Sequence, residues 1–212
     1  MRLIILAAGD SFELDGYHKL FIKNPDSGKT ILEEYVDLFD ASNVTIVVGY
    51  KAMEIMNAYP QFNYVYNKKW QTTGSAYSLS LALDEEPCIV LESDFFIDKK
   101  SKEELNEKDF YVVLRDSESK NLNSFKAIVE GETISGVYRG AAKNNDLELL
   151  GFFKVNSSEI LREWKKNGVQ NPQQYIGESF PFDKTDLPYL VLNGESISEI
   201  NTPMDYINFI SK

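Results

Sequence analysis

Cysteine and histidine are almost absent from this chain of 212 residues, which has one of each, Cys88 and His18. One cysteine cannot form an internal disulfide, and Cys88 lies in an apolar run, so we expect it in the core of a cytoplasmic protein. A zinc site built from cysteine and histidine is excluded by the same counts. Carboxylates are the only plentiful metal ligands, with 33 Asp and Glu residues, and hard oxygen ligands favour Mg²⁺.

Basic residues are also in short supply. The chain has 22 Lys and Arg residues against 33 Asp and Glu, which gives a formal net charge of −11. This balance argues against nucleic-acid binding, because neutralising a phosphate backbone needs a basic face. It also repels anionic small molecules at long range, so an enzyme that handles phosphates with this charge would need a bound divalent cation.

Long apolar runs are missing as well. No run approaches the roughly 20 residues that a membrane span needs, and Leu3–Ala8 is far too short for a cleaved leader. The hydrophobic fraction of 43% and the aromatic fraction of 13% are those of a soluble globular protein. We therefore expect one domain over residues 1–212, with a sizeable core and no membrane segment.

The first twenty residues carry the most informative pattern that is present. An apolar run, Arg2–Leu6, leads into Ala7-Ala8-Gly9, and a lysine follows at position 19. A short apolar run that ends in small residues predicts a buried parallel strand that breaks into a loop. Small residues there let a ligand lie against the backbone amides, and Lys19 supplies a charge for phosphate oxygens. The alternative interpretation is an ordinary exit from a strand, with no ligand.

Neither of the two best-known phosphate loops fits this turn. Gly9 is followed by no glycine until Gly16, so GxGxxG fails. The tripeptide Gly28-Lys29-Thr30 lacks the earlier glycine that would complete a Walker loop.

Strands and helices alternate through the first half of the chain. The apolar patterns and turn residues predict strands at Leu3–Ala8, Val44–Val48, Asn63–Tyr66 and Cys88–Glu92, and helices at Ile31–Phe39, Ala52–Ala58 and Ser75–Leu83. This βαβ succession predicts an α/β, Rossmann-like fold with a mostly parallel central sheet flanked by helices.

The second half changes character and predicts a small mixed β extension. Strands are expected at Phe110–Leu114, Lys126–Val129, Thr133–Val137, Leu149–Val155, Tyr189–Leu192 and Ser196–Ile200. A helix is expected over Ser157–Lys166, capped by Ser157 and ended by Gly168, and a last helix begins near Pro203.

Several polar or small segments follow the predicted strands. They are Ala7-Ala8-Gly9, Gly49-Tyr50, Ser93-Asp94 and Glu199-Ile200-Asn201, and Gly74-Ser75 begins a helix. In open α/β sheets, ligands sit outside the carboxyl ends of the strands. We therefore expect these segments to meet at one ligand site.

Taken together, the pattern resembles the nucleotidyltransferases of the sugar-1-phosphate and choline-phosphate cytidylyltransferase type, with the MobA-like NTP transferases. Their signature is LAAGxGxR followed by PKxL, an acidic metal ligand after a buried strand, and a late acidic motif. The matching segments here are Leu6-Ala7-Ala8-Gly9, Lys19-Leu20, Asp94 and Glu199-Ile200-Asn201, and Thr73–Leu79 resembles the segment that grips the base. The resemblance spans nearly the whole chain and implies a glycosyltransferase-A-like fold.

Three positions depart from the family pattern. Ser11 and Glu13 stand where the family has its second glycine and its arginine, and His18 replaces the proline before the lysine. The loop over the triphosphate must therefore be built differently. Glu13 is unfavourable beside phosphates unless its side chain points away or binds a metal. The reaction needs no acid or base from His18, which we expect to pack the loop.

The resemblance implies a Mg²⁺-dependent transfer of a nucleoside monophosphate from a triphosphate, with CTP favoured, to a small phosphorylated acceptor, releasing pyrophosphate. Choline phosphate, an aminoalkyl phosphate or phosphonate, and a sugar phosphate are the expected acceptors, in surface-polysaccharide or phospho-modification biosynthesis. Lys19 and Asp94 are the implied catalytic residues, and Asp94 with Glu199, Asn201 or both would hold the metal. The residues implied at the nucleotide are Leu6, Ala7, Ala8, Gly9, Gly49, Thr73, Gly74 and Ser75.

The acceptor site is the least determined part. Arg139 or Lys143 would assist, and Tyr77 and Glu178 are further acceptor candidates. Aromatic residues near these segments would suit an acceptor ammonium group, although aromatics in such a chain are more often core. They are Trp70, Tyr77, Phe95, Phe96, Phe152, Phe153, Tyr175, Phe180 and Phe182.

Two other functions stay open. A nucleotide-sugar glycosyltransferase would use Glu92-Ser93-Asp94 as a degenerate DxD motif, but it gives Lys19 no task. A non-catalytic nucleotide-binding domain is suggested by Glu13 in place of the arginine.

Overall fold

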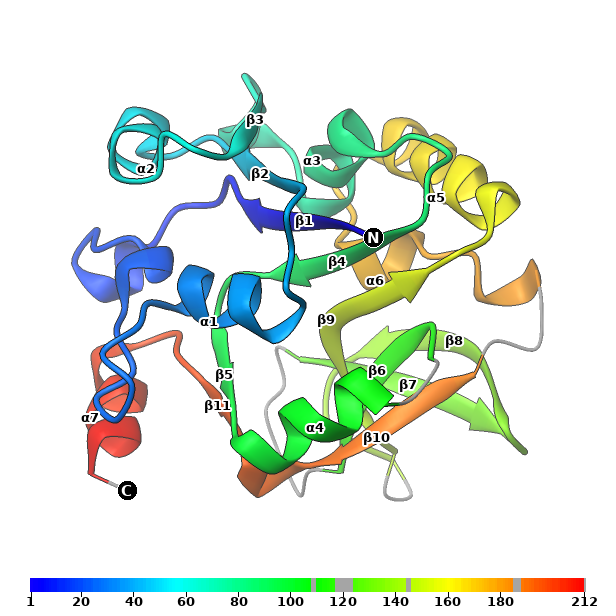
Figure 1. Cartoon of the computed structure of the whole chain (residues 1–212). Coiled ribbons are helices and arrows are strands. Elements are labelled where there is room, and N and C mark those ends of the chain that lie inside the picture. Colours follow the sequence, from blue (N-terminus) through cyan, green and yellow to red (C-terminus); the bar gives the residue numbers. More distant parts are fainter. Residues whose placement is uncertain (108–109, 117–123, 144–145, 185–187, 212) are drawn as a thin grey trace.

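A mixed sheet of nine strands forms the centre of the protein, whose computed structural model describes residues 1–107, 110–116, 124–143, 146–184 and 188–211 (Figure 1). The main path of the sheet runs β10-β6-β9-β4-β1-β2-β3. Its strands are β1 (Arg2–Ala7), β2 (Val44–Val48), β3 (Asn63–Tyr66), β4 (Cys88–Glu92), β6 (Val112–Asp116), β9 (Glu148–Val155) and β10 (Tyr189–Asn193). The pairs among β4, β1, β2 and β3 are parallel, whereas β9 runs antiparallel to both β4 and β6. The α/β prediction is confirmed.

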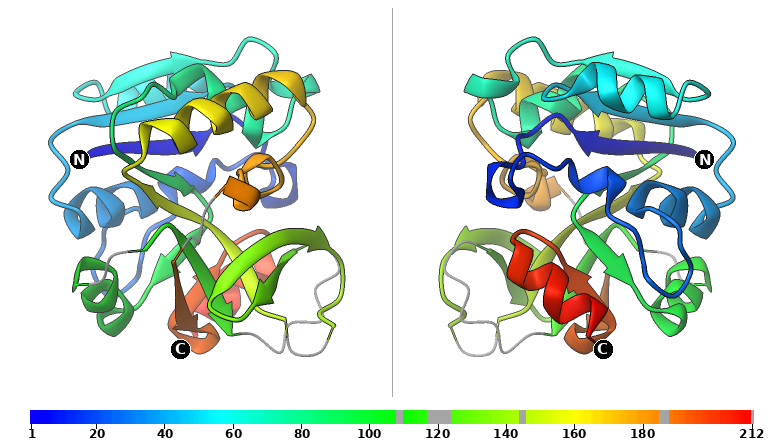
Figure 2. Two further views of the ribbon diagram at one scale, coloured as in Figure 1. Left: turned by 90° about the vertical axis from the view of Figure 1, so that its right-hand side faces the viewer. Right: turned by 90° about the vertical axis from the view of Figure 1, so that its left-hand side faces the viewer.

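Helices cover both faces of the sheet because the residues of β1 point alternately to opposite sides. Leu3, Ile5 and Ala7 join one core with residues of α1 (Ile31–Leu38), α2 (Ala52–Ala58) and α4 (Lys99–Glu107). Ile4, Leu6 and Ala8 join a second core with α3 (Ser75–Ala82), α5 (Ser158–Gln170) and α6 (Ile176–Ser179). Figure 2 shows α5 lying across one side of the sheet and α1 with α2 on the other.

The expected β extension continues the main sheet. A hairpin of β7 (Phe125–Glu130) and β8 (Thr133–Arg139) turns at Gly131, whose φ of +66° suits glycine, and β7 pairs with β9. Separately, β5 (Phe95–Ile97) pairs antiparallel with β11 (Ile197–Glu199). This small ribbon places the late segment beside Asp94, because the Ile200 N–H donates to the Asp94 carbonyl at 2.7 Å.

Two helix boundaries test the predicted caps. Ser157 caps α5 as expected, since its side chain accepts from the Ile160 N–H. Gly168 does not end that helix, however, because α5 continues to Gln170. A Cβ at Gly168 would lie 2.5 Å from the Ala76 carbonyl oxygen, so this glycine permits close packing of α5 on α3. The last helix, α7 (Pro203–Ile210), begins at Pro203 behind a Thr202–Asp205 capping box.

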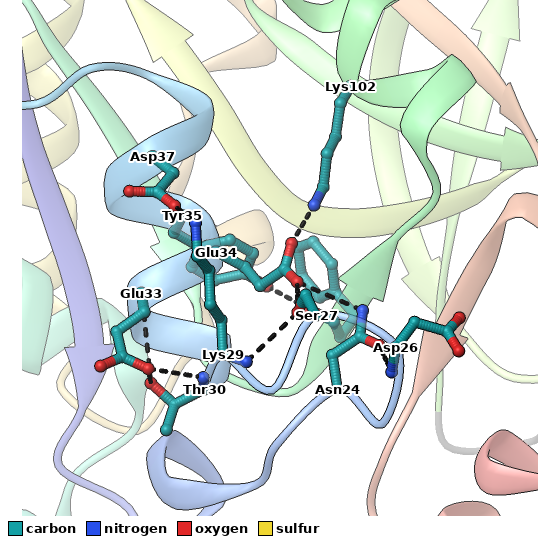
Figure 3. Close-up of polar contacts among 11 residues, drawn as sticks. Asn24, Asp26, Ser27, Lys29, Thr30, Glu33, Glu34, Tyr35, Asp37 and Lys102 are labelled. Atoms are coloured by element: carbon teal, nitrogen blue, oxygen red, sulfur yellow. Dashed lines mark hydrogen bonds and ion pairs between the residues drawn. The ribbon is translucent and has the colours of Figure 1, made fainter.

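A buried carboxylate fastens α1 to its surroundings (Figure 3). Thr30 and Glu33 form a capping box at the start of α1, and Glu34 points inward from its first turn. Glu34 accepts hydrogen bonds from Asn24 and Ser27 and pairs with Lys102 of α4. This cluster ties the 24–29 loop and α4 to one face of the sheet.

No helix in the described ranges combines the length and the apolar character that crossing a bilayer requires.

Candidate active site

A cavity of about 1070 Å³ opens at the carboxyl ends of β1 and β4. Its wall includes segments from the start, middle and end of the chain, brought together because β1 and β4 are adjacent and parallel. Most of the residues predicted from the sequence line it: Leu6, Ala7, Ala8, Gly9, Lys19, Thr73, Gly74, Ser75, Asp94, Arg139, Glu199 and Asn201.

Lys19 lies against two of the predicted metal ligands. Its Nζ is 3.5 Å from the Asp94 Oδ2 atom and donates a hydrogen bond to the Asn201 Oδ1 atom. Asp205 holds Asn201 in turn, since its carboxylate accepts from the Asn201 N–H at 3.0 Å. The Lys19 ammonium thus contacts one oxygen atom of Asp94 and one of Asn201, two residues more than a hundred positions apart in sequence.

Glu199 is engaged on both of its carboxylate oxygens. Asn201 donates to one at 2.6 Å and Arg115 to the other at 2.8 Å. The same guanidinium donates to Glu148 at 2.8 Å, so Arg115 joins the end of β11 to β9. Burial, followed by the negative charge of Asp94, raises the pKa of Glu199 above its ordinary value, and Arg115 opposes that shift.

The oxygen atoms around Lys19 bear on the expected Mg²⁺ site. Asp94 and Asn201 both direct an oxygen at the Lys19 ammonium, which acts there as a stand-in cation. This donor chemistry suits a hard cation. Glu199 is turned instead to Asn201 and Arg115, and no preformed group of three or more His, Cys, Asp or Glu metal ligands occurs in the described part of the chain. Asp94 and Asn201 therefore fit Mg²⁺ better than Glu199 does.

The turn after β1, at Ala7-Ala8-Gly9, is held in place by hydrogen bonds to its carbonyl groups. The Ala8 carbonyl accepts from the Tyr50 N–H at 3.0 Å, and the Ala7 carbonyl lies 3.2 Å from the His18 Nε2 atom. His18 Nδ1 accepts from the Leu20 N–H, so its Nε2 must carry the proton and donate to Ala7. A Cβ at Gly9 would meet nothing within 4 Å, which leaves space beside the backbone.

His18 packs the loop, as expected from the sequence. The ring is 2% exposed, and burial lowers its pKa to about 4. It is therefore neutral near pH 7, and it fixes the segment from which Lys19 reaches the cavity.

The start of α3 lines the cavity, but its backbone is already engaged. The Gly74 N–H donates to the Pro172 carbonyl at 2.7 Å, and the Ala76 N–H donates to Gln174 at 3.1 Å. A Cβ at Gly74 would lie 2.2 Å from the Gln174 carbonyl oxygen, so glycine is needed for this close approach. These two amides hold the 172–174 segment, and a ligand would meet the side chains of this wall.

Besides Lys143, three predicted site residues are not in the cavity wall. Gly49 has no room for a Cβ, which would lie 2.5 Å from the Trp70 Cβ and 2.6 Å from the Ala8 carbonyl oxygen. Tyr77 lies under the Lys69 ammonium, 5.6 Å from the ring centroid. Glu178 is exposed and accepts from the Tyr175 N–H at 2.9 Å, which caps α6. Gly49 supports the site indirectly, and Glu178 has a local structural task.

Some of the basic and aromatic acceptor candidates line the cavity, and the others lie outside its wall. Arg139 lines the cavity, with its guanidinium 5.5 Å from the Tyr175 ring centroid and 5.9 Å from that of Phe125, whereas Lys143 stacks on Tyr138 outside the wall. Trp70, Phe95 and Tyr175 are in the wall. The other aromatics named from the sequence, apart from Tyr77, are buried in the two cores: Phe96, Phe152, Phe153, Phe180 and Phe182.

Glu92 also lines the cavity, and the sequence named it only as part of a degenerate DxD motif in an alternative function. Gly151 leaves room for its carboxylate, since a Cβ there would lie 2.2 Å from the Glu92 Oε2 atom. Burial, then the charge of Asp94, raises its pKa to about 8. Its position at the end of β4, two residues before Asp94, was the available signal. Asp10, Glu148 and Asp205 also line the cavity, without a comparable signal.

Solved structures with the same fold include nucleotidyltransferases. Similar to this chain are the CTP:phosphocholine cytidylyltransferase LicC of Streptococcus pneumoniae (TM-score 0.76, 20% identity, covering 100% of this chain and 99% of that one) and the inositol-1-phosphate CTP transferase of T. maritima (TM-score 0.71, 16% identity, covering 100% and 95%). A third is a nucleoside-diphosphate-sugar pyrophosphorylase of Vibrio cholerae (TM-score 0.73, 16% identity, covering 99% and 100%).

In sequence, no family model and no curated protein matches the chain. The mixed, mostly parallel sheet flanked by helices is the glycosyltransferase-A-like fold of the nucleotidyltransferases, as the sequence predicts.

Proposed function

We propose that this protein is a Mg²⁺-dependent nucleotidyltransferase that transfers CMP from CTP to a small phosphorylated acceptor and releases pyrophosphate. The observation that carries the proposal is the meeting of Lys19, Asp94 and Asn201 at one point of one cavity. A fold shared with nucleotidyltransferases supports the reaction class, and two of the similar proteins are by name a CTP:phosphocholine cytidylyltransferase and an inositol-1-phosphate CTP transferase.

The reaction asks the protein mainly to position charges. A phosphate oxygen of the acceptor attacks the α-phosphorus of the nucleotide in line, a bond to that phosphorus forms, and the bond to pyrophosphate breaks. Because little proton transfer is needed, orientation and charge neutralisation supply most of the catalysis. The His18 imidazole, neutral and bound to Ala7, takes no part as an acid or base.

Lys19 and Asp94 would exchange partners when substrate arrives. In the structure the Lys19 ammonium neutralises Asp94 and Asn201. A triphosphate offers that ammonium stronger acceptors, and the two oxygen ligands then become available to Mg²⁺. Asp94 and Asn201 would hold the Mg²⁺, which would supply positive charge for the phosphate groups of the nucleotide. Glu199 would orient Asn201 through their hydrogen bond while it stays paired with Arg115.

The acceptor would bind in the half of the cavity formed by β7, β8 and β9. Arg139 is held there beside Phe125 and Tyr175, and a guanidinium suits the phosphate of an acceptor. Choline phosphate, an aminoalkyl phosphate or phosphonate, and a sugar phosphate all carry such a group.

The test is a screen of four nucleoside triphosphates against these acceptors with Mg²⁺, following pyrophosphate release. We expect CTP with one acceptor to give turnover, and Asp94→Asn to lower kcat by roughly 10²-fold, as removal of a key electrostatic group does. The matched control is Asp37→Asn, an exposed carboxylate on α1, with unchanged kcat.

Two results would overturn the proposal in different ways. Binding of CTP without pyrophosphate release from any acceptor would make the protein a nucleotide-binding domain. Release of a nucleoside diphosphate from a nucleotide sugar, with no reaction of free triphosphates, would make it a glycosyltransferase that uses Glu92 and Asp94, which both line the cavity.

A further inference from the structure

One stretch of the cavity wall carries no charge. It consists of residues 70–74 together with Gln173, which present an indole, amides and hydroxyls. The sheet order separates it from the charged part, because Trp70 packs beside the end of β2, whereas Asp94 follows β4 and Glu148 begins β9 on the other side of β1. A ligand with an apolar ring at one end and phosphates at the other would match this division.

Trp70 is the aromatic residue of that uncharged stretch, and its orientation is fixed. Its Cβ and Cγ atoms lie close to Gly49, where any side chain would collide with them. The Tyr50 ring packs against the indole with centroids 5.5 Å apart, and Phe12 packs behind Tyr50 at 5.9 Å. The Trp70 N–H also donates to the carbonyl of Asn67, a fully buried residue.

The indole is therefore rigid yet not fully covered. Trp70 is half-buried, packs on the core that includes Ala8, and lines the cavity beside the small-residue turn. Holding an aromatic ring in place beforehand lowers the entropy that a ligand loses when it stacks on it. Tyr50 and Gly49, neither of which lines the cavity, have a task in this arrangement: they hold the indole.

We propose that Trp70 is the stacking platform for the nucleobase, and that it sets affinity for nucleosides in general while the neighbouring amides and hydroxyls select among bases. The inference rests on the proposed function, because it assigns the base end of the same nucleotide site. Every base has an aromatic face, so stacking on an indole is tolerant of base identity. The turn after β1 then lies between the base and the phosphates.

Tryptophan fluorescence tests this directly in the unaltered protein. The chain has two tryptophans, and Trp164 is 1% exposed, with its Nε1–H donating to the Ile176 carbonyl at 3.1 Å. We expect cytidine and CTP–Mg²⁺ to change the emission, tripolyphosphate–Mg²⁺ to leave it unchanged, and Trp70→Phe to lose the response. An equal response in Trp70→Phe would overturn the stacking role.

Binding measurements on variants give a second readout. Trp70→Ala is expected to weaken the binding of cytidine and of CTP by the same factor, about tenfold. It should leave the binding of tripolyphosphate unchanged. Trp70→Phe, which keeps a ring and the packing on Gly49, should stay within about threefold of the parent. The matched control is Tyr66→Ala, which removes an exposed aromatic side chain outside the cavity wall. It should leave the affinity for both cytidine and CTP unchanged.

The possible outcomes distinguish a failure of the Trp70 inference from a failure of the proposed transferase function. Nucleotide binding and turnover that are unaffected in Trp70→Ala would end the inference and leave the transferase proposal intact. A parent protein that binds tripolyphosphate but no nucleoside or nucleotide would end both.

Discussion

Gly9 and Gly49 lie next to the same turn and illustrate opposite reasons for a glycine. A Cβ at Gly9 would meet nothing in the protein, so a methyl group there can collide only with a ligand. A Cβ at Gly49 would collide with Trp70 and with the Ala8 carbonyl. The first glycine is available for binding, and the second is required for folding.

We predict that the two alanine variants separate stability from binding. Gly9→Ala should unfold in urea as the parent does but bind CTP at least about tenfold more weakly, because its methyl group occupies ligand space. Gly49→Ala should lose about 2 kcal/mol of unfolding free energy through overpacking. A destabilised Gly9→Ala that still binds CTP normally would contradict the assignment of this turn.

His18 gives a prediction about pH. Its pKa falls from 6.5 to about 4 on folding, so the unfolded chain binds the proton more readily below pH 6.5. Stability from the neutral ring is fully present above pH 6.5 and is lost as the pH falls toward 4, by about 3 kcal/mol in all. His18→Gln can keep both hydrogen bonds without titrating. The difference in urea unfolding free energy between parent and variant should shrink over that window, and a constant difference would refute the shift.

At the scale of elements, α1 carries two acid–lysine pairs that differ in burial. Lys102 pairs with Glu34, whose side chain is 7% exposed, whereas Lys29 pairs with Asp37, of which 54% is exposed. Figure 3 shows both lysines reaching the same helix. Removing a cation from a buried carboxylate leaves an uncompensated charge, but removing it from an exposed one costs little.

Lys102→Ala should therefore lower the unfolding free energy by about 2 kcal/mol, and Lys29→Ala by less than about 0.5 kcal/mol. Urea unfolding at neutral pH measures both. Double replacement of Glu34 and Lys102 by Gln and Met should recover part of the loss, since no buried charge is left. Equal losses of unfolding free energy in Lys102→Ala and Lys29→Ala would mean that the buried Glu34–Lys102 contact stabilises the fold no more than the exposed pair does.

Elements with a clear apolar period could be predicted, and those without one could not. The strand Cys88–Glu92 and the cap at Ser157 are where the sequence puts them. The helix α4 was missed because its residues are mostly charged and only a few of them, such as Leu105 and Ser101, are buried. The helix α6 has four residues, too few for a periodic signal.

At the scale of the whole molecule, position along the chain predicted more of the site than side-chain pairing did. Asp94 and Asn201 were expected at one site because turns at strand ends collect at one sheet edge, and the family resemblance implied their roles and that of Lys19. The pairing of Arg115 with Glu199 and Glu148 joins residues far apart in sequence. Such contacts depend on strand register and carry no signal in a single sequence.

The charge of the cavity gives a prediction for the whole protein. Its wall contains seven acidic side chains against two basic ones: Asp10, Glu13, Glu92, Asp94, Glu148, Glu199 and Asp205, with Lys19 and Arg139. Glu92 adds little negative charge near pH 7, because its pKa is raised to about 8, but the other acidic side chains still outnumber the basic ones. Together with the net charge of −11, they should repel a free triphosphate.

In EDTA we expect CTP to bind at least about tenfold more weakly than with Mg²⁺. Added NaCl should strengthen the metal-free binding, since salt screens repulsion beyond about 10 Å at 0.1 M. Isothermal titration calorimetry over a salt series measures both. Weakening of metal-free binding by salt would mean that the triphosphate meets a net positive field.

The site joins Lys19 to Asn201, and the ribbon of β5 with β11 forms only when both strands are present. A ribosome therefore has to synthesise the chain past Asn201 before Lys19 can make this contact. Nascent chains and fragments truncated before β11 lack both the β5–β11 ribbon and the Lys19–Asn201 contact.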